Sequence, residues 1–194
     1  MYRNLWEYVA ALERAGELVR VAAEVDPVLE IAELTDRESK RPRGGRALLF
    51  ERTGTSFPVL TNMMGSDRRI ALALGVESLD DLTRRIESLF SELTAPKTSL
   101  SDKLCMLPLL ERMSRWLPRN RRGRGACQQV VRTGDEVRLS ELPVLKCWPF
   151  DGGRFVTFPL VHTVDPESGV RNVGMYRMQV FSERSTGMHW HVHK

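Results

Sequence analysis

The chain has 194 residues, 42% of them hydrophobic, so it is long enough to bury one large core or two small ones, and it is not a disordered chain. Its net charge of +4 is moderate, which favours anionic ligands without requiring nucleic acid. The three cysteines are widely spaced and form no Cys-x-x-Cys pair, which argues against a disulfide framework or a thiolate zinc site and favours a reducing cytoplasm. The N-terminal segment carries charges throughout, which argues against a signal peptide. No apolar run of about 18 residues occurs, which argues against a membrane span.

Two helices are predicted in the first 40 residues. Apolar residues recur at helical spacing over positions 5–15, and Gly16 follows as a stop. In the next segment, VDPVLEIAELTDRESK, Asp26 is a candidate N-cap and Pro27 a candidate first helical residue, ahead of a second apolar face.

A pair of strands and a third helix come next. Apolar runs at 47–50 and 57–60 are separated by Thr-Gly-Thr, which predicts two strands joined by a turn. In the segment SLDDLTRRIESLFSEL, Ser78 and Asp81 form a capping-box pattern, and leucine and isoleucine side chains follow along one side. Residues 78–93 are therefore the strongest helix prediction in the chain.

The chain becomes rich in proline from about residue 95, and an arginine-rich stretch at 114–126 is typical of an exposed linker. Its arginines could contact nucleic acid, but no aromatic residues are interleaved at 119–125 and no recognition fold is apparent, so a solvated linker is favoured. We therefore predict an N-terminal α/β domain at 1–113, a linker at 114–126 and a mainly β domain at 127–194, giving an α+β fold.

Strand patterns dominate the second region. The segment QQVVR is strand-like, and Asp-Pro-Glu-Ser-Gly at 165–169 lies between two β-rich runs as a hairpin turn. The second run, RNVGMYRMQVF, is unusually polar for a half-buried strand, and polar groups on a strand need partners or a purpose. Unless a bulge at Gly174 re-aims them, alternation divides its side chains between two faces: Asn172, Gly174, Tyr176 and Met178 on one, and Val173, Met175, Arg177 and Gln179 on the other.

The last seven residues, MHWHVHK, place three histidines in alternation with Trp190 and Val192. On a strand the three would share one face, where positions i and i+2 lie about 7 Å apart and i and i+4 about 13 Å apart, so at most two can bind one metal. An edge strand that happens to be rich in histidine is the alternative. An asparagine carbonyl with a histidine nitrogen suits Mn²⁺ or Mg²⁺, but two ligands are too few for a closed site.

Several stretches together carry a resemblance to a known family. The segment GGRFVTFPLVHTVDPESGVRNVGMYRMQV, followed by HWHVHK, resembles the start of the cofactor domain of the UbiD family, the prenylated-FMN-dependent decarboxylases of aromatic and α,β-unsaturated acids. The opening NLWEYVAALERAGELVRV and the P-V-L-x-N-M-x-G-S stretch at 58–66 are similar to that family's N-terminal domain. The resemblance implies an N-terminal α/β domain followed by the first part of a split β-barrel that binds flavin.

The resemblance also implies roles for individual residues. Asn172 and His193 match the ligands of a divalent ion, usually Mn²⁺, with His191 as the alternative histidine if a gap shifts the register. Arg177 matches the arginine of a glutamate–arginine–glutamate catalytic network, whose acidic members have no counterpart in this chain. The positions that match residues around the flavin and its phosphate are Thr157, Met175, Tyr176, Arg177, His189, Trp190, His191 and Lys194.

The resemblance therefore implies a carboxy-lyase that performs non-oxidative, reversible decarboxylation with prenylated FMN and Mn²⁺, with K⁺ as a possible further ion. The first expected substrate is a polyprenyl-hydroxybenzoate-type precursor of a quinone, which would imply peripheral membrane association. Because family members are more than twice as long and form oligomers, we interpret the chain as an N-terminal fragment of a cytoplasmic homo-oligomer and expect it to be inactive alone. The alternatives are a flavin- or metal-binding fragment without turnover and, less favoured, a basic nucleic-acid-binding domain.

Overall fold

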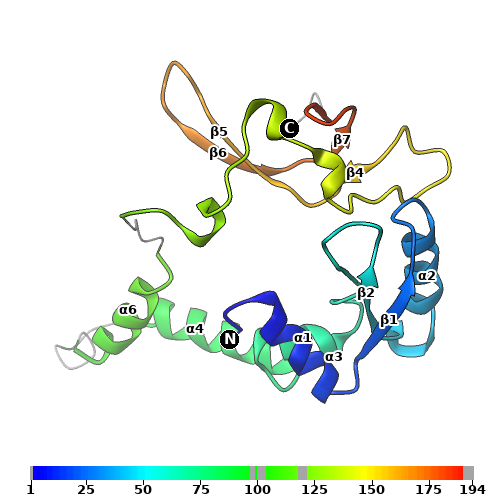
Figure 1. Ribbon diagram of the computed structural model, residues 1–194. Coiled ribbons are helices and arrows are strands. Elements are labelled where there is room, and N and C mark those ends of the chain that lie inside the picture. Colours follow the sequence, from blue (N-terminus) through cyan, green and yellow to red (C-terminus); the bar gives the residue numbers. More distant parts are fainter. Residues whose placement is uncertain (1, 97–98, 100–103, 118–121, 190–194) are drawn as a thin grey trace. The chain divides into compact units, whose positions relative to one another are not determined.

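The computed structural model describes residues 2–96, 99, 104–117 and 122–189, and its mixed helices and sheets confirm the predicted α+β class (Figure 1). The chain forms two compact units, one made of Met1–Glu77 with Thr133–Lys194 and the other of Ser78–Arg132. The division into domains at 1–113, 114–126 and 127–194 stays a prediction. No helix in the described ranges is both long enough and apolar enough to cross a membrane.

The N-terminal part of the first unit is a three-stranded sheet with helices. Strand β1 pairs parallel with β2, and β2 pairs antiparallel with β3, which confirms the two predicted strands and their turn. A parallel neighbour needs a crossover connection, and the helix α2 provides it between β1 and β2. The elements are α1 (Leu5–Arg14), β1 (Leu18–Glu24), α2 (Glu30–Ser39), β2 (Ala47–Arg52), β3 (Val59–Thr61) and α3 (Asp67–Leu74).

The core of this region lies on both faces of β2, whose residues 47–50 are all buried. Successive side chains of a strand point to opposite faces. Ala47 accordingly packs with Tyr8 and Leu12 of α1, whereas Leu48 and Phe50 pack with Ile31 of α2 and its neighbours. A continuous apolar run is therefore the expected sequence signature of a strand that is covered on both sides.

The first predicted helix is confirmed, but the second begins later than predicted. The carboxylate of Asp26 accepts the N–H of Val28, and the carbonyl of Lys146 accepts the N–H of Leu29, so this segment forms a turn and an isolated bridge instead of a helical turn. Leu29 has a φ of 72°, and α2 begins at Glu30. The prediction of Asp26 as N-cap was wrong because residue 146, more than a hundred positions away, competes for the backbone.

The helix α3 was missed by the sequence reasoning, although Ser66 directly before Asp67 is a cap signal. The Ser66 Oγ accepts the N–H of Arg69. Arg69 is fully buried and its guanidinium donates to Glu17 at 2.9 Å and to the carbonyls of Gly44 and Gly45 at 3.0 and 2.6 Å. The Tyr8 hydroxyl donates to the Arg69 carbonyl at 3.0 Å, and burial raises the pKa of Tyr8. These bonds tie α3 to α1 and to the segments that lead into β1 and β2.

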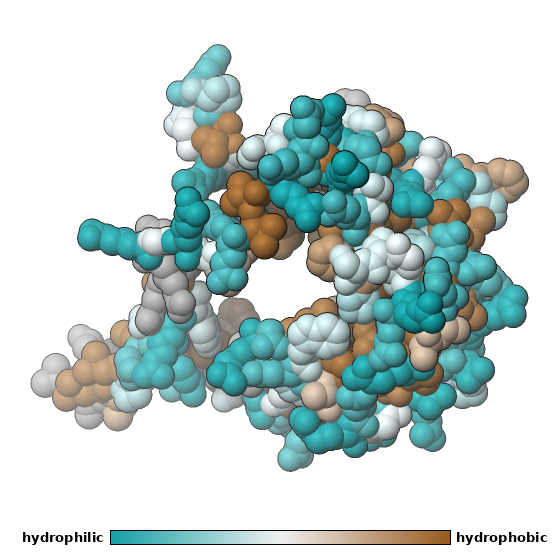
Figure 2. Space-filling view, in the orientation of Figure 1, coloured by the Kyte–Doolittle hydropathy of each residue, from teal (hydrophilic) through white to brown (hydrophobic). Residues whose placement is uncertain are grey.

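The second unit contains α4 (Leu79–Thr94) and α6 (Leu107–Ser114). The Ser78 side chain accepts the N–H of Asp81, so the predicted helix and its cap are confirmed. Although α4 is strongly amphipathic, none of its residues is buried, and Ile86 and Phe90 are 45% and 62% exposed. Hydrophobic residues also reach the surface elsewhere on the face of the molecule drawn in Figure 2.

The strands after residue 150 form two sheets. One has the antiparallel order β4-β7-β8, and the other is the hairpin of β5 and β6, whose Asp-Pro-Glu-Ser-Gly turn confirms the prediction. Within the turn, hydrogen bonds to the Asp165 carboxylate lower its pKa, and the largest contribution comes from the Ser168 hydroxyl. The strands are β4 (Phe155–Val156), β5 (Leu160–Val164), β6 (Arg171–Met175), β7 (Met178–Val180) and β8 (Thr186–Met188).

Two strand predictions in this region were wrong. The QQVVR segment (128–132) begins at the last residue of a short 3-10 helix, Ala126–Gln128, and continues as irregular chain. Val130 and Val131 are exposed, and the segment has no partner strand in the described residues. The predicted strand from 171 onward follows the expected alternation only to Met175. There it breaks and continues as β7 in the other sheet, because Tyr176 turns back across Gly174, where a Cβ would lie 2.5 Å from its ring.

Candidate active site

Three of the residues predicted to line the flavin are brought together at one end of the β4-β7-β8 sheet. Val156 of β4 pairs with Met178, and Met178 pairs with Met188 of β8. One position beyond these pairs, Thr157 follows β4, Arg177 precedes β7 and His189 follows β8, so these three residues lie side by side at the end of the sheet. The N–H of His189 donates to the Arg177 carbonyl at 3.1 Å. Opposed residues of antiparallel strands share a face, so the sheet orders these side chains as a row.

The side chain of Arg177 is held from two directions. Its Nη2 lies 2.9 Å from Oδ2 of Asp151 and its Nη1 lies 3.4 Å from Oδ1, which is a two-point contact with the carboxylate. The guanidinium carbon also lies 3.8 Å from the centre of the Phe155 ring, a cation–π contact. Arg177 is 39% exposed and Asp151 is 14% exposed, so the pair stands at the edge of the surface with the carboxylate on the inner side.

The loop that carries Asp151 contains a turn and is joined to β7 at its end, where the Arg154 carbonyl accepts the N–H of Val180 at 2.9 Å. The N–H of Asp151 donates to the carbonyl of Trp148 at 3.1 Å. Gly152 packs against the amide of Gln179 on β7, where an added Cβ would lie 3.0 Å from Nε2. The backbone at Gly152 and Gly153 thus lies against the Gln179 side chain.

Cys147 precedes this loop and is partly buried. Burial raises the pKa of its thiol, the charge of Arg177 acts in the opposite direction, and Asp151 adds to the increase. A thiol with a raised pKa is mostly protonated at neutral pH and is a poor nucleophile. Cys147 therefore has the properties of a packing residue near Arg177.

The other predicted residues lie outside this row. Asn172 is exposed on β6 opposite Thr163, in the hairpin and not in the β4-β7-β8 sheet. Met175, at the end of β6, is 55% exposed, and Tyr176 is half-buried across Gly174. The assignment of all these residues to a flavin or metal site stays a prediction.

The last four predicted site residues, Trp190, His191, His193 and Lys194, lie outside the described residues. Of the three predicted alternating histidines, the structure therefore describes His189 alone. The described ranges contain no group of three histidine, cysteine, aspartate or glutamate side chains placed to hold a metal. Of the predicted metal ligands they include Asn172 alone, and one amide oxygen does not make a site. No chemical step is assigned to a metal here.

The row at the sheet end does suit a polar cofactor with an acidic substrate. Thr157 and His189 are exposed and offer a hydroxyl and an imidazole, while Arg177 offers a half-exposed guanidinium. A guanidinium has five N–H donors, so the pair with Asp151 leaves others available for a second carboxylate. The row therefore offers donors for a carboxylate beside polar groups for a hydrogen-bonding ring system.

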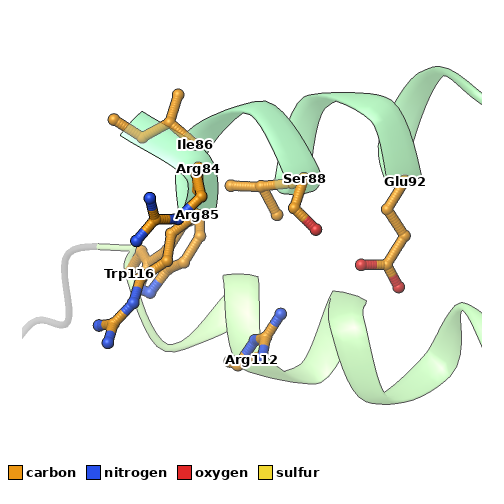
Figure 3. A pocket seen from close by; sticks show the side chains of 8 residues that line it. Arg84, Arg85, Ile86, Ser88, Glu92, Arg112 and Trp116 are labelled. Atoms are coloured by element: carbon orange, nitrogen blue, oxygen red, sulfur yellow. The ribbon is translucent and has the colours of Figure 1, made fainter. Parts of the chain in front are cut away.

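Two cavities lie away from this row. One of about 540 Å³ lies between α4 and α6, and Figure 3 shows Arg85 and Trp116 at one end of it with Glu92 and Arg112 farther along. Another, of about 720 Å³, is lined by arginines around Glu17 and Glu38. The two carboxylates are largely buried and are paired with those arginines, so the second cavity is the opening of an ion-pair network. Neither cavity contains a predicted site residue.

Comparison with known proteins defines the class of protein to which this fold and site belong. Residues 9–89 match the 3-octaprenyl-4-hydroxybenzoate carboxy-lyase N-terminal domain, and residues 119–194 match the Rift-related domain of the same enzymes. The chain therefore belongs to the UbiD family, as the sequence motifs predicted.

The curated relatives are longer than this chain. Uncharacterized proteins of Aquifex aeolicus and Archaeoglobus fulgidus are 47% and 46% identical over all 194 residues, and the chain spans 39% and 38% of their lengths.

Solved structures of UbiD-class enzymes are also similar to this chain. HmfF of Pelotomaculum thermopropionicum in complex with FMN is 28% identical with a TM-score of 0.67, covering 97% of this chain and 37% of that one. An evolved dimeric form of HmfF in complex with prFMN is also 28% identical, with a TM-score of 0.66 over 98% of this chain and 39% of that one. Vanillic acid decarboxylase of Sedimentibacter hydroxybenzoicus in its closed form is 27% identical, with a TM-score of 0.72 over 97% and 37%.

Proposed function

We propose that this chain forms the N-terminal part of a prenylated-FMN-dependent decarboxylase that acts on an aromatic or α,β-unsaturated acid. The observation that carries the proposal is the row of Thr157, Arg177 and His189 at one end of the β4-β7-β8 sheet. Support also comes from the two matched family domains and from the likeness to HmfF and to vanillic acid decarboxylase. A polyprenyl-hydroxybenzoate-type precursor of a quinone is the first substrate to test.

The chemistry assigns separate tasks to the cofactor and to the protein. Decarboxylation leaves a pair of electrons on carbon, and no side chain of this chain can accept them, so the bound flavin supplies the electron sink. Arg177 would hold the substrate carboxylate through paired hydrogen bonds, which would orient the substrate for loss of that group. Thr157 and His189 border the same space and offer polar groups to the cofactor. An acid outside this chain delivers the proton to the product carbon.

The metal and the assembly are parts of the same proposal. Asn172 and His193 would contribute to a Mn²⁺ site, with His191 as the alternative ligand, and Lys194 would contact the flavin phosphate. We further propose that the complete protein is a homo-oligomer, since an evolved form of HmfF is dimeric. Of the family's glutamate–arginine–glutamate network this chain matches only the arginine, so by itself it should bind cofactor without turnover.

The test compares two lengths of chain. The 194-residue chain and a chain extended to the full length of its curated relatives are each supplied with prenylated flavin and Mn²⁺, and carbon dioxide release is measured with cinnamic-type and hydroxybenzoic-type acids. We expect turnover from the extended chain alone, because loss of a general acid removes a factor of about 10² to 10⁴. Turnover by the short chain, or none by the flavin-loaded extended chain with any acid, would contradict the proposal.

Variants of the extended chain test the role of Arg177. Arg177→Ala should abolish turnover and leave flavin content largely intact. Arg177→Lys should also fail, because an ammonium cannot reproduce the planar two-point contact. Arg184→Ala is the matched control, since Arg184 is an exposed arginine that pairs with Asp135 on the surface.

A further inference from the structure

We propose that Asp151 is the positioning residue of Arg177: its carboxylate occupies the outer edge of the guanidinium and leaves the Nε edge for the substrate. The proposal rests on the proposed function for the role of Arg177, and on the structure for the contact itself. Asp151 and Arg177 are 26 residues apart in sequence, so the contact depends on the fold.

The geometry of the contact determines which donors remain. Asp151 approaches end-on, since one oxygen lies by Nη1 and the other by Nη2, at 3.4 and 2.9 Å. An end-on contact uses one N–H from each terminal nitrogen, and the Nε–H with the adjacent terminal N–H forms a second, separate edge. Within the described part of the chain no acceptor is hydrogen-bonded to that Nε–H. A second carboxylate can therefore bind side-on while Asp151 stays in place.

Phe155 supplies the other constraint. Its ring lies against the guanidinium at 3.8 Å, so the ring fixes the plane while Asp151 fixes the rotation within that plane. Free arginine side chains have several rotatable bonds and sample many positions. With both contacts made, the Nε edge has one direction, and the row formed with Thr157 and His189 lies at the same end of the sheet.

The Asp151 contact differs from an ordinary surface ion pair in burial and in support. Asp151 is 14% exposed, whereas Asp135, which pairs with Arg184, is 97% exposed. The backbone of Asp151 is bonded to Trp148, and the glycine after it packs against Gln179. The loop is also joined to β7, because the Arg154 carbonyl accepts the N–H of Val180, so its position and that of the Asp151 carboxylate are set by the sheet.

The first experiment measures the position of Arg177 in the 194-residue chain itself. The Nε–H proton of an arginine stacked on a ring is shifted upfield by the ring current, and Phe155→Leu identifies this signal by removing the shift. Asp151→Asn keeps the size of the side chain and removes its charge. We expect the shift to change in Asp151→Asn, because the guanidinium can then rotate against the ring, and to stay the same in Asp135→Asn. An unchanged shift in Asp151→Asn would overturn the proposal.

The second experiment measures the consequence in the extended, flavin-loaded chain. A misplacement of about 1 Å at a positioning group costs about 10²-fold in rate, so Asp151→Asn should lower kcat/KM by about that factor with flavin content and folding unchanged. Asp135→Asn should leave kcat/KM unchanged. Asp151→Glu keeps the charge at a shifted position, so its kcat/KM should lie between those of Asp151→Asn and the wild type. If Arg177→Ala abolishes turnover while Asp151→Asn does not reduce it, the proposal is wrong. If the wild-type extended chain shows no turnover, the proposed function fails, and the proton shift still decides whether Asp151 holds Arg177.

Discussion

The strand β2 and the helix α4 both have strong apolar patterns, but only the strand is buried. Four consecutive residues of β2 are covered, with α1 on one side and α2 on the other. The helix α4 has a clear cap and a well-defined apolar side, yet every one of its residues is at least partly exposed. The same holds for the β5 and β6 hairpin, where Leu160, Val164 and Val173 are more than half exposed.

This difference shows that an amphipathic pattern specifies which side of an element needs a partner, and that it does not supply one. Burial contributes stability only where a second element covers the apolar side. The N-terminal sheet finds most of its partners among residues 2–73, with Leu145 added from later in the chain. If stability follows burial, substitutions on β2 should be more destabilising than matched substitutions on α4.

The largest effect is expected from truncating one of two phenylalanines. Phe50 is fully buried on β2, and Phe90 is 62% exposed on α4. Phe50→Ala should lower the free energy of unfolding by about 3–5 kcal/mol, because it removes buried apolar surface and leaves a cavity. Phe90→Ala should change it by less than about 1 kcal/mol. Urea unfolding followed by circular dichroism measures both values. Equal losses of unfolding free energy in the two variants would show that stability does not follow burial in this chain.

Removing the buried arginine should have the next largest effect. Arg69→Met keeps much of the volume but leaves the carbonyls of Gly44 and Gly45 without their donor and Glu17 with Arg68 as its remaining partner. We expect a loss of about 3 kcal/mol. Arg37→Met is the control, since the pair of Arg37 with Glu33 is exposed and worth less than about 0.5 kcal/mol. A small loss for Arg69→Met would mean that the buried network contributes little.

The two serine caps sharpen the comparison at a smaller scale. Ser66 caps α3, which packs in the N-terminal region, and Ser78 caps α4. Ser66→Ala should lower the free energy of unfolding by about 1 kcal/mol. Ser78→Ala should instead reduce the helical signal of the native protein, because α4 has little tertiary packing to hold its first turn. The opposite assignment of these two effects would show that α4 is the better supported helix.

The smallest effect is a difference in rate between cysteines. Burial raises the pKa of Cys147, and the reactive species is the thiolate, so Cys147 should be alkylated more slowly at pH 8 than the exposed Cys105 and Cys127. The difference should narrow as the pH rises toward the pKa of Cys147. Arg177→Gln removes a charge that lowers this pKa and should slow the reaction further. Mass spectrometry of labelled peptides follows each site, and faster labelling in Arg177→Gln would place Arg177 away from Cys147.

Features that depend on near neighbours could be predicted from the sequence. The helix at 5–14 and the cap at Ser78 follow from side-chain spacing and from a hydroxyl that reaches a backbone N–H three residues on. The turn at 165–169 follows from residues that bond within the same five positions. The family motifs also lie within continuous segments, and the sequence alone therefore identified the UbiD family.

What only the tertiary structure decided involves residues distant in sequence. The start of α2 depends on Lys146, and the break after Met175 places Arg177 beside Thr157 and His189 instead of in a continued β6. The partner of Arg177 is Asp151, which no spacing rule selects. A local pattern defines the preferences of a segment, but the competition for its backbone and side chains is settled by groups that the fold brings from elsewhere.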